Sequence, residues 1–335
     1  MDIARAAGVH RTTVCLALKN HPHIPEPTRA KIREIAEKLG YTPDPMLSAL
    51  AVYRDRNHPR AFQGTLAWLA NSISPFDWRK KTIFKNNYDG AVECARSYGY
   101  NVEILDLQAS GMSPKRMANI LESRNITGLL VAPQPYPNTT LDFPWKNFSA
   151  ITFGFTLSKP ALHRVTSSVY MATLQTIRRV RELGYRRIGF AFTSVQGERT
   201  NHNALSAYLS EMFLHGEETL VMPMHPEGCT PNELRKWVEQ VRPEVICGSL
   251  DIMQMFEEGG GKVSSGLALA CPMMAEDKGP ISGVCENSRL VGEIAVDHLV
   301  AMLQRDERGV PAVPQHILVE GQWVPGTTLP MRTAQ

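Results

Sequence analysis

The spacing of hydrophobic residues predicts three short helices within the first forty positions. In the segment 10–18, apolar side chains recur three and four positions apart, as on one face of a helix; they are Val14, Ala17 and Leu18. A shorter apolar face over 2–8 ends at Gly8, and another apolar stripe runs over 27–39. Two short helices joined by a glycine-containing turn form a helix-turn-helix, whose second helix can enter the major groove of DNA.

The pattern changes after the third helix. Pro43 and Pro45 prevent that helix from continuing, and residues 45–53 are predicted to form a separate short helix with Pro45 in its first turn. Residues 54–60 are charged and contain Pro59, which predicts a linker.

After position 61, apolar strand-like runs alternate with amphipathic helical runs. This alternation is typical of βαβ units and parallel sheets, and the remaining length suits two such layered subdomains. Strands are expected over 65–71, 102–107, 128–133, 150–155, 187–193, 219–223, 244–249 and 266–271. Helices are expected over 86–98, 114–124, 168–183, 200–214, 231–241, 250–258 and 287–304.

Positive charge is concentrated at the N-terminal end of the chain. Residues 1–60 hold ten Lys or Arg and six Asp or Glu, a net charge of +4, whereas the other residues together carry −1. A basic segment attached to a nearly neutral body suits a polyanionic partner such as nucleic acid.

The sequence contains no pattern typical of a metal site, a cofactor site or a catalytic centre. Its six cysteines include no C-x-x-C pair, so they are expected to be free thiols in a reducing compartment. No P-loop, G-x-S-x-G, H-E-x-x-H or G-x-G-x-x-G motif stands out. No apolar run approaches the ~18 residues of a membrane span, and no signal peptide is evident. We therefore expect a cytoplasmic protein that is not an enzyme and uses neither a metal nor a cofactor.

Residues 2–20, DIARAAGVHRTTVCLALKN, resemble the D-I-A-x-x-A-G-V-S-x-x-T-V-S-x-x-L-N signature of the lactose-repressor/galactose-repressor family of transcription regulators. The resemblance continues through Ile24, Thr28-Arg29 and Ala36–Pro45. It implies a small all-α helix-turn-helix domain over 1–43, a hinge helix and linker over 44–60, and an effector-binding and dimerisation domain over 61–335. The last of these would have the two-lobed α/β fold of periplasmic binding proteins (type I).

The resemblance also implies which residues contact DNA. Arg11 can donate two hydrogen bonds to guanine, and Thr12 can bond a base or contact a thymine methyl group. Leu50, in the hinge helix, matches a leucine that wedges into the minor groove and kinks the duplex, although it could instead be a core or dimer-contact residue. The expected DNA contacts are Arg11, Thr12, Thr13, Leu16, Lys19, Asn20, His23, Arg29, Tyr41 and Leu50.

In the body, the resemblance implies two lobes joined by three crossings, with a ligand between them. The N-lobe is expected over about 61–156 and 287–309, and the C-lobe over about 157–286 and 310–335. Aromatic rings can stack on a sugar, and carboxylates or amides can bind its hydroxyl groups. The candidate effector contacts are Asn71, Trp78, Phe155, Asp251 and Glu286, each of which could also be an ordinary loop or packing residue.

Several positions depart from the family pattern. His10 replaces the serine that begins the second helix and is expected to be a weaker cap, and Leu16 cannot donate a hydrogen bond to a base. The arginine that the family places before its x-G-[FW] motif is missing from Asn203–Tyr208, and Arg199 is the nearest. These losses predict an effector other than a common hexose, or an effector site with altered chemistry.

Together these observations predict a homodimeric regulator that binds a pseudo-palindromic DNA operator and responds to a small molecule such as a sugar. We expect it to be a repressor. Two alternatives stay open from the residues. One is a DNA-binding regulator whose effector domain is degenerate and takes no ligand. The other is a small-molecule binding protein or an enzyme that carries an accidental helix pair.

Overall fold

The computed structural model describes residues 3–18, 24–39, 62–215, 221–260 and 267–332. The predicted hinge helix, 45–53, and the linker that follows it lie outside these ranges. Among the described residues, no helix combines the length and apolar character needed to cross a bilayer.

Three helices form the N-terminal domain: α1 (Ile3–Ala7), α2 (Arg11–Leu18) and α3 (Glu26–Lys38). The predicted helices are confirmed to within two residues at each described end. Gly8 adopts a φ of +67° between the first two helices, a left-handed conformation that favours glycine. The small core that holds them together consists of Ile3, Ala4, Val14, Ala17, Ile32 and Ala36.

The N-lobe is built on a six-stranded sheet in which every pair of neighbours is parallel. Its order is β12 (His316–Val319), β7 (His163–Ser167), β5 (Ser149–Phe153), β3 (Gly128–Val131), β1 (Gly64–Ala70) and β2 (Tyr100–Asp106). Alternate residues of β1 face opposite sides. Leu66 and Trp68 pack beneath α5 (Thr82–Ser97) and α12 (Ser288–Arg305), whereas Ala67 and Leu69 pack beneath α6 (Pro114–Ser123).

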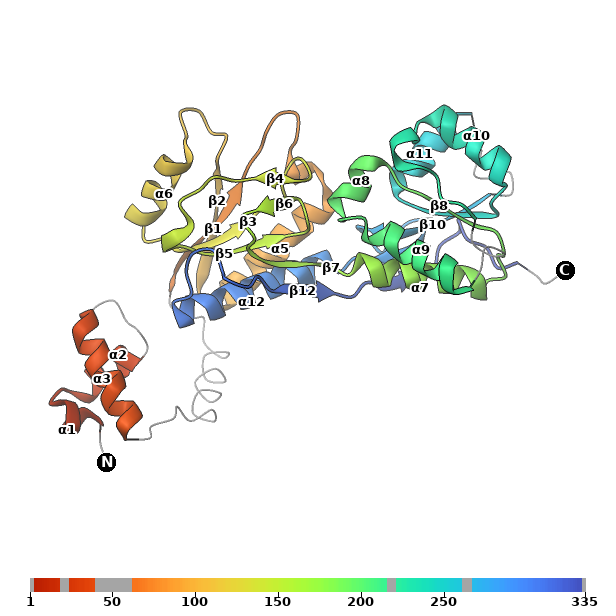
Figure 1. Ribbon diagram of the computed structural model, residues 1–335. Helices are drawn as coiled ribbons and strands as arrows, with labels where there is room; N and C mark the ends of the chain where they lie inside the picture. Colours follow the sequence, from red (N-terminus) through yellow and green to blue (C-terminus); the bar gives the residue numbers. More distant parts are fainter. Residues whose placement is uncertain (1–2, 19–23, 40–61, 216–220, 261–266, 333–335) are drawn as a thin grey trace.

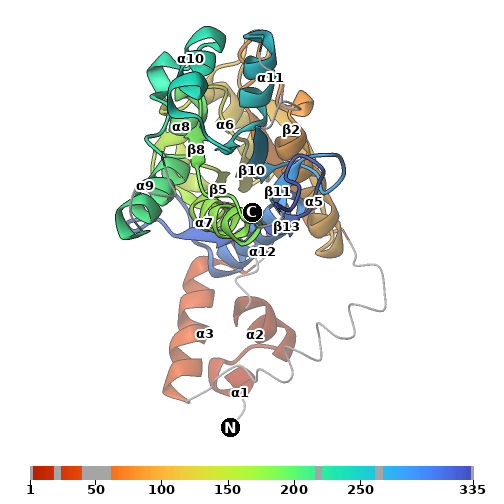
Figure 2. The same cartoon turned by 90° about the vertical axis from the view of Figure 1, so that its right-hand side faces the viewer.

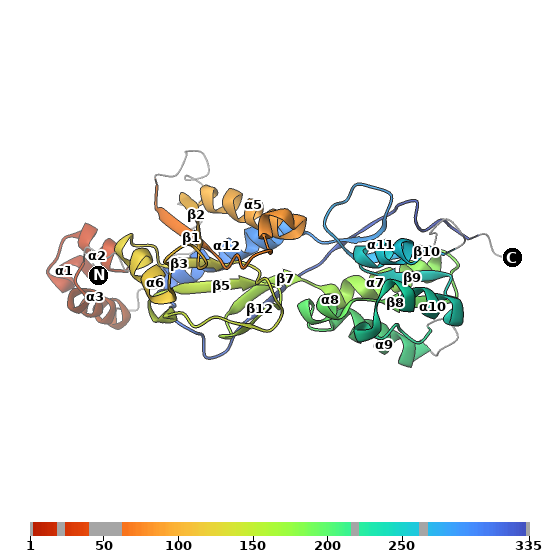
Figure 3. The ribbon, with the colours of Figure 1, turned by 90° about the horizontal axis from the view of Figure 1, so that it is seen from above.

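Helices α5 and α12 lie side by side on one face of this sheet (Figure 3). They approach so closely that two glycines are required at the contact. A Cβ atom at Gly90 would lie 2.0 Å from the carbonyl oxygen of Arg289, and one at Gly292 would lie 2.0 Å from that of Asn87. This contact fixes α5, whose N-terminal end reaches the space between the lobes.

The C-lobe contains a five-stranded sheet covered by helices on both faces. Its order is β13 (Gln322–Val324), β11 (Ser282–Cys285), β10 (Ala268–Met274), β9 (Val245–Gly248) and β8 (Ile188–Ala191), with only β13 antiparallel. Helices α7 (Val169–Glu182) and α9 (Asn203–His215) cover one face, and α10 (Pro231–Val241) and α11 (Leu250–Glu258) cover the other (Figure 2).

The chain crosses between the lobes three times (Figure 1). The crossing between β11 and α12 lies where it was predicted. The other two follow β7 and β12, about ten residues later than the predicted boundaries at 156/157 and 309/310, because both strands belong to the N-lobe sheet.

Strand β7 was missed because four of its five residues, HRVTS, are polar, yet all five are buried. Hydrogen bonds to other segments satisfy part of its polar side chains, although Arg164 Nε has no partner among the described residues. His163 Nδ1 accepts a hydrogen bond from the Gln315 amide, and an Arg164 Nη atom donates to the Leu157 carbonyl at 3.2 Å. A buried strand made mostly of polar residues lacks the apolar run on which strand prediction depends.

Two other expectations need correction. The predicted helix 200–214 corresponds to α9, which begins three residues later because Asn201 and His202 adopt positive φ values. The short helix before it, α8 (Ser194–Arg199), was not predicted. Of the predicted strand 219–223, the described residues 221–223 are not in a strand. The sequence pattern also gave no sign of the short pair β4 (Thr139–Thr140) and β6 (Leu157–Lys159), or of β11, β12 and β13.

Candidate functional site

Helix α2 presents a polar face to solvent and an apolar face to its own domain. Arg11 and Thr12 are exposed, Thr13 and Leu16 are half-buried, and Val14 and Ala17 are buried. The first four are the described residues of α2 that were expected to contact DNA, and their exposure allows that role. An arginine and a threonine at the beginning of an exposed helix can reach base edges in a major groove.

The remaining predicted DNA contacts fall into two groups. Arg29, on α3, keeps about a fifth of its side chain exposed (21%) and forms an ion pair with Glu26 one turn earlier. The others lie outside the described residues; they are Lys19, Asn20, His23, Tyr41 and Leu50.

His10 caps the beginning of α2, although the sequence suggested a weaker cap than serine. Its Nδ1 atom accepts a hydrogen bond from the backbone N–H of Thr12 at 3.3 Å and lies 2.9 Å from the Thr12 hydroxyl oxygen. The ring therefore satisfies a helix N–H that has no partner within the helix, as a serine side chain does in this position. It also fixes the hydroxyl of a residue expected to contact a base.

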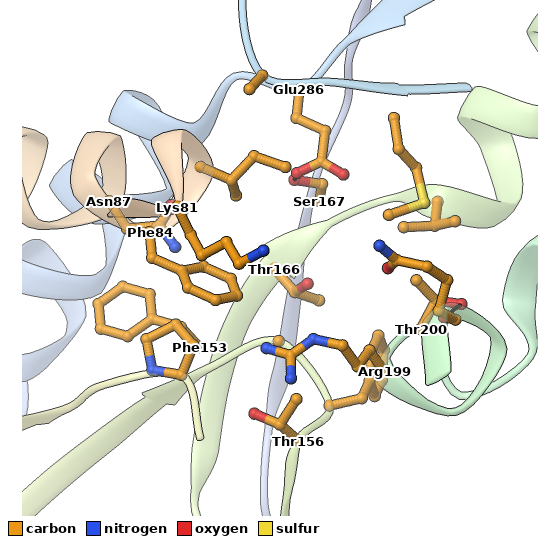
Figure 4. Close-up of a pocket in the computed structure, with 18 of the residues that line it drawn as sticks. Lys81, Phe84, Asn87, Phe153, Thr156, Thr166, Ser167, Arg199, Thr200 and Glu286 are labelled. Atoms are coloured by element: carbon orange, nitrogen blue, oxygen red, sulfur yellow. Dashed lines mark hydrogen bonds between the residues drawn. The ribbon is translucent and has the colours of Figure 1, made fainter. Parts of the chain in front are cut away.

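A cavity of about 590 Å³ lies between the two lobes, within the range of small-molecule sites (Figure 4). Its N-lobe wall comes from the beginning of α5 and from the ends of β5 and β7, and its C-lobe wall from α8, the beginning of α11 and the end of β10. Three of the five predicted effector contacts line it: Phe155, Asp251 and Glu286.

The other two candidates do not line this cavity. Trp78 is only 2% exposed and packs in the N-lobe core, with its ring centroid 5.3 Å from that of Trp68 and 5.2 Å from that of Tyr88. Asn71 is buried, and it donates to Gln134 Oε1 at 3.0 Å and accepts from Gln108 Nε2 at 2.7 Å. The cavity therefore does not include these two candidates, because a position beyond a strand end does not reveal whether the following loop folds inward.

Glu286 is buried at the crossing between β11 and α12. Its Oε2 atom accepts a hydrogen bond, at 3.0 Å, from the hydroxyl group of Ser167, the last residue of β7. Burial raises the pKa of this carboxyl group to about 7, and the Ser167 hydrogen bond opposes the shift only in part. Glu286 therefore exchanges a proton near neutral pH at a point where two crossings meet.

Arg199 is the most informative residue that sequence reasoning placed incorrectly, because it was noted only as the arginine nearest to a missing one. From the end of α8 it reaches across the cavity and donates hydrogen bonds to the carbonyl oxygens of Pro135, at 2.9 Å, and Gln134, at 3.2 Å. Its guanidinium carbon lies 5.3 Å from the centroid of the Phe84 ring. Burial lowers the pKa of Arg199. This side chain therefore links the C-lobe to the N-lobe across the candidate site.

Comparison with known proteins identifies the N-terminal domain. Residues 1–44 match the family described as "Bacterial regulatory proteins, lacI family". The family match thus covers the N-terminal helices and not the two-lobed body. Among curated proteins, the chain is 49% identical over 53 residues to "Probable HTH-type transcriptional repressor ExuR" of Bacillus subtilis (strain 168), a match that covers 16% of each chain. It is 25% identical over 193 residues to "HTH-type transcriptional repressor CytR" of Escherichia coli (strain K12), which covers 56% of this chain and 51% of that protein.

These matches therefore span one sixth of the first curated relative and about half of the second. Solved structures extend the likeness of fold to the whole chain. The lac repressor dimer bound to operator and the anti-inducer ONPF has a TM-score of 0.56 at 16% identity, with 98% of each chain covered. The transcriptional regulator CelR in complex with cellobiose has a TM-score of 0.54 at 15% identity, covering 97% of this chain and 98% of that one. The lacI-family fold, a helix-turn-helix followed by a two-lobed α/β body, is thus present in this protein.

Proposed function

We propose that this protein is a homodimeric transcriptional repressor that binds a pseudo-palindromic DNA operator. Its affinity for the operator would change when a small molecule binds in the interlobe cavity. The observation that carries the proposal is the exposure of Arg11 and Thr12 at the beginning of α2, in the segment that matches the lacI family. The curated relatives are described as repressors, which supports repression as the output.

The cavity favours this function over a regulator that takes no ligand. It lies between lobes whose polar contacts include the two bonds of Arg199 and a 3.4 Å hydrogen bond from Asn86 to the Ala275 carbonyl. A ligand that bound both walls would compete with or add to these contacts and so shift the arrangement of the lobes. The crossings that end β7 and β12 would transmit that shift through the N-lobe sheet toward the DNA-binding domain.

We further propose that the protein acts in the cytoplasm on chromosomal DNA and has no catalytic activity. A cluster of three His, Cys, Asp or Glu side chains suited to a metal ion does not occur among the described residues. The proposal rests on the relatives, which are described as transcriptional repressors.

The direct test is selection of bound duplexes from a random pool by the purified full-length chain, followed by fluorescence anisotropy with the selected sequence. We expect enrichment of a two-fold symmetric site. Because an arginine–guanine contact contributes ~1–3 kcal/mol, we expect Arg11→Ala to weaken binding roughly ten- to a hundredfold and to relax base preference at one position in each half-site.

The matched control is Lys115→Ala, which removes one positive charge from the exposed surface of α6 and should leave operator affinity unchanged. Failure to enrich any sequence, together with no binding of any duplex at low salt, would exclude DNA recognition. Equal losses from Arg11→Ala and Lys115→Ala would exclude α2 as the base-reading element.

A further inference from the structure

Three positively charged side chains line the interlobe cavity, and they come from both lobes. Lys80 and Lys81 precede α5 in the N-lobe, and Arg199 ends α8 in the C-lobe. Figure 4 shows Lys81 and the Arg199 guanidinium directed into the cavity from opposite sides. Cations that converge on one enclosed space concentrate positive potential there.

The two lysines are available to a ligand. Their neighbours Arg79 and Lys85 form ion pairs with Asp77 and Asp89. Within the described part of the chain, neither Lys80 nor Lys81 forms an ion pair, and both side chains are exposed to the cavity solvent. Their charge is therefore not neutralised by the protein that surrounds them.

The two carboxyl groups of the cavity offset this charge only in part. Asp251 accepts a hydrogen bond from Gln196 at 3.0 Å, and Glu286 accepts one from Ser167. In the described part of the chain, neither forms an ion pair with Lys80, Lys81 or Arg199. Because burial raises the pKa of Glu286 to about 7, this group carries only part of a negative charge at neutral pH.

The backbone adds to the positive potential at the same wall. Lys81 occupies the N-cap position of α5, where no side chain caps the helix. Thr82 and Ile83 line the cavity in the first turn of this 16-residue helix, where backbone N–H groups have no partner within the helix. Such a helix end favours an anion, and here it lies beside two lysines.

Two buried polar atoms of the cavity wall have no hydrogen-bond partner among the residues that the structure describes. They are Asn87 Oδ1, on α5, and Ser249 Oγ, at the N-cap of α11, and both residues are at least nine-tenths buried (5% exposed each). An unsatisfied buried oxygen is costly unless a ligand or water supplies its partner. An amide oxygen requires a donor, which a ligand hydroxyl group provides. Threonine hydroxyls surround the same space, from Thr156, Thr166, Thr193 and Thr200.

From these observations we propose that the effector is an anionic polyol, a small polyhydroxylated molecule that carries a carboxylate or phosphate group. Its charged group would lie against Lys80, Lys81 and the beginning of α5, and its hydroxyl groups would bond Asn87 and Ser249 across the cavity. Arg199 would close over it from the C-lobe, with the Phe84 ring beneath the guanidinium. This inference rests on the cavity being the effector site of the proposed regulator.

The test is isothermal titration of the full-length protein, without DNA, against three matched panels: neutral hexoses, the corresponding hexuronates and the corresponding hexose 6-phosphates. We expect binding by at least one anionic compound and at least tenfold weaker binding by its neutral counterpart. Comparison of the two anionic panels distinguishes a carboxylate ligand from a phosphate ligand. For the compound that binds, we expect Lys80→Gln/Lys81→Gln to weaken affinity roughly a hundredfold, since each lysine contributes a charge-assisted contact.

Lys115→Gln/Lys146→Gln serves as the control, since it removes two positive charges from exposed positions outside the cavity lining, and it should bind the ligand normally. Circular dichroism melts of all variants separate loss of the site from loss of the fold. Equal affinity for neutral and anionic partners, no binding by any anionic compound, or unchanged affinity in the double lysine variant would each overturn the proposal. DNA selection with the same preparation reports on the proposed function separately, so that failure of one is not mistaken for failure of the other.

Discussion

The two walls of the interlobe cavity differ in charge and in the source of their polar groups. The N-lobe wall carries Lys80, Lys81 and the uncapped beginning of α5, and among its described residues there is no carboxylate. The C-lobe side carries one cation, Arg199, together with Asp251 and, at the crossing into α12, Glu286. The difference indicates that the two lobes bind different parts of a ligand. The N-lobe would bind its charged group, and the C-lobe would bind its neutral groups and close over it.

Reversal of a positive charge on the N-lobe wall should reduce ligand affinity more than any other change to the cavity considered below. Lys81→Glu replaces an attraction by a repulsion at the position closest to the expected anion, and we expect ligand affinity to fall by roughly a hundredfold or more. Titration calorimetry measures the change. Asp251→Asn, which removes a negative charge from the other wall, should not weaken anion binding; if both variants weakened it equally, the two walls would not differ as described.

The N-lobe wall also depends on the close contact of α5 with α12. Gly292→Ala places a Cβ atom 2.0 Å from the Asn87 carbonyl oxygen, so the helices must separate. We expect a loss of about 1–3 kcal/mol in the free energy of unfolding, measured by urea denaturation. Gln304→Ala, at an exposed position of the same helix, should change it by less than about 0.5 kcal/mol. A stable Gly292→Ala protein with unchanged ligand affinity would show that the wall does not require this contact.

The C-lobe contribution to closure can be tested through Arg199. Arg199→Met keeps an unbranched side chain but removes the guanidinium group and both hydrogen bonds to Gln134 and Pro135, which should open the lobes and lower ligand affinity roughly tenfold. Small-angle scattering of the ligand-free protein should then give a larger radius of gyration. Arg186→Met, an exposed arginine in the same lobe, is the control and should alter neither quantity.

Ligand affinity should also depend on pH, although less strongly than on the substitutions above. Glu286 is neutral below its raised pKa of about 7 and negatively charged above it, so affinity for an anionic ligand should fall several-fold between pH 6 and pH 8. A carboxylate ligand is needed for this titration, because a phosphate monoester itself titrates near pH ~6. Glu286→Gln should abolish the dependence. None of the described residues that line the cavity is a histidine, so a dependence that persisted in this variant would place its source outside the cavity.

The three described helices of the N-terminal domain could be predicted because their information is local. Within α2, the buried positions and the exposed Arg11 and Thr12 follow from a single helical period, and Gly8 marks the turn before it. The same holds for α10 and α11, whose predicted and observed bounds are identical.

The cavity could be predicted only in part because its residues converge from distant segments. Phe155 and Glu286 were selected near expected lobe crossings and Asp251 after a strand, and all three line the cavity. The loop after the first strand also suggested Trp78, which packs in the core instead. Lys81 and Arg199 carry no local signal of their role. Their importance depends on where α5 begins relative to the end of α8, which the pattern of hydrophobic residues does not specify.

In the proposed regulator, operator binding at α2 is coupled to ligand binding in the interlobe cavity of the same molecule. The most direct test is anisotropy of a labelled, selected operator, titrated with the full-length protein in the presence and absence of a saturating ligand identified by calorimetry. We expect operator affinity to change at least tenfold, in wild type but not in Lys80→Gln/Lys81→Gln. If the protein bound both the operator and the ligand but the ligand left operator affinity unchanged, the two sites would not be coupled.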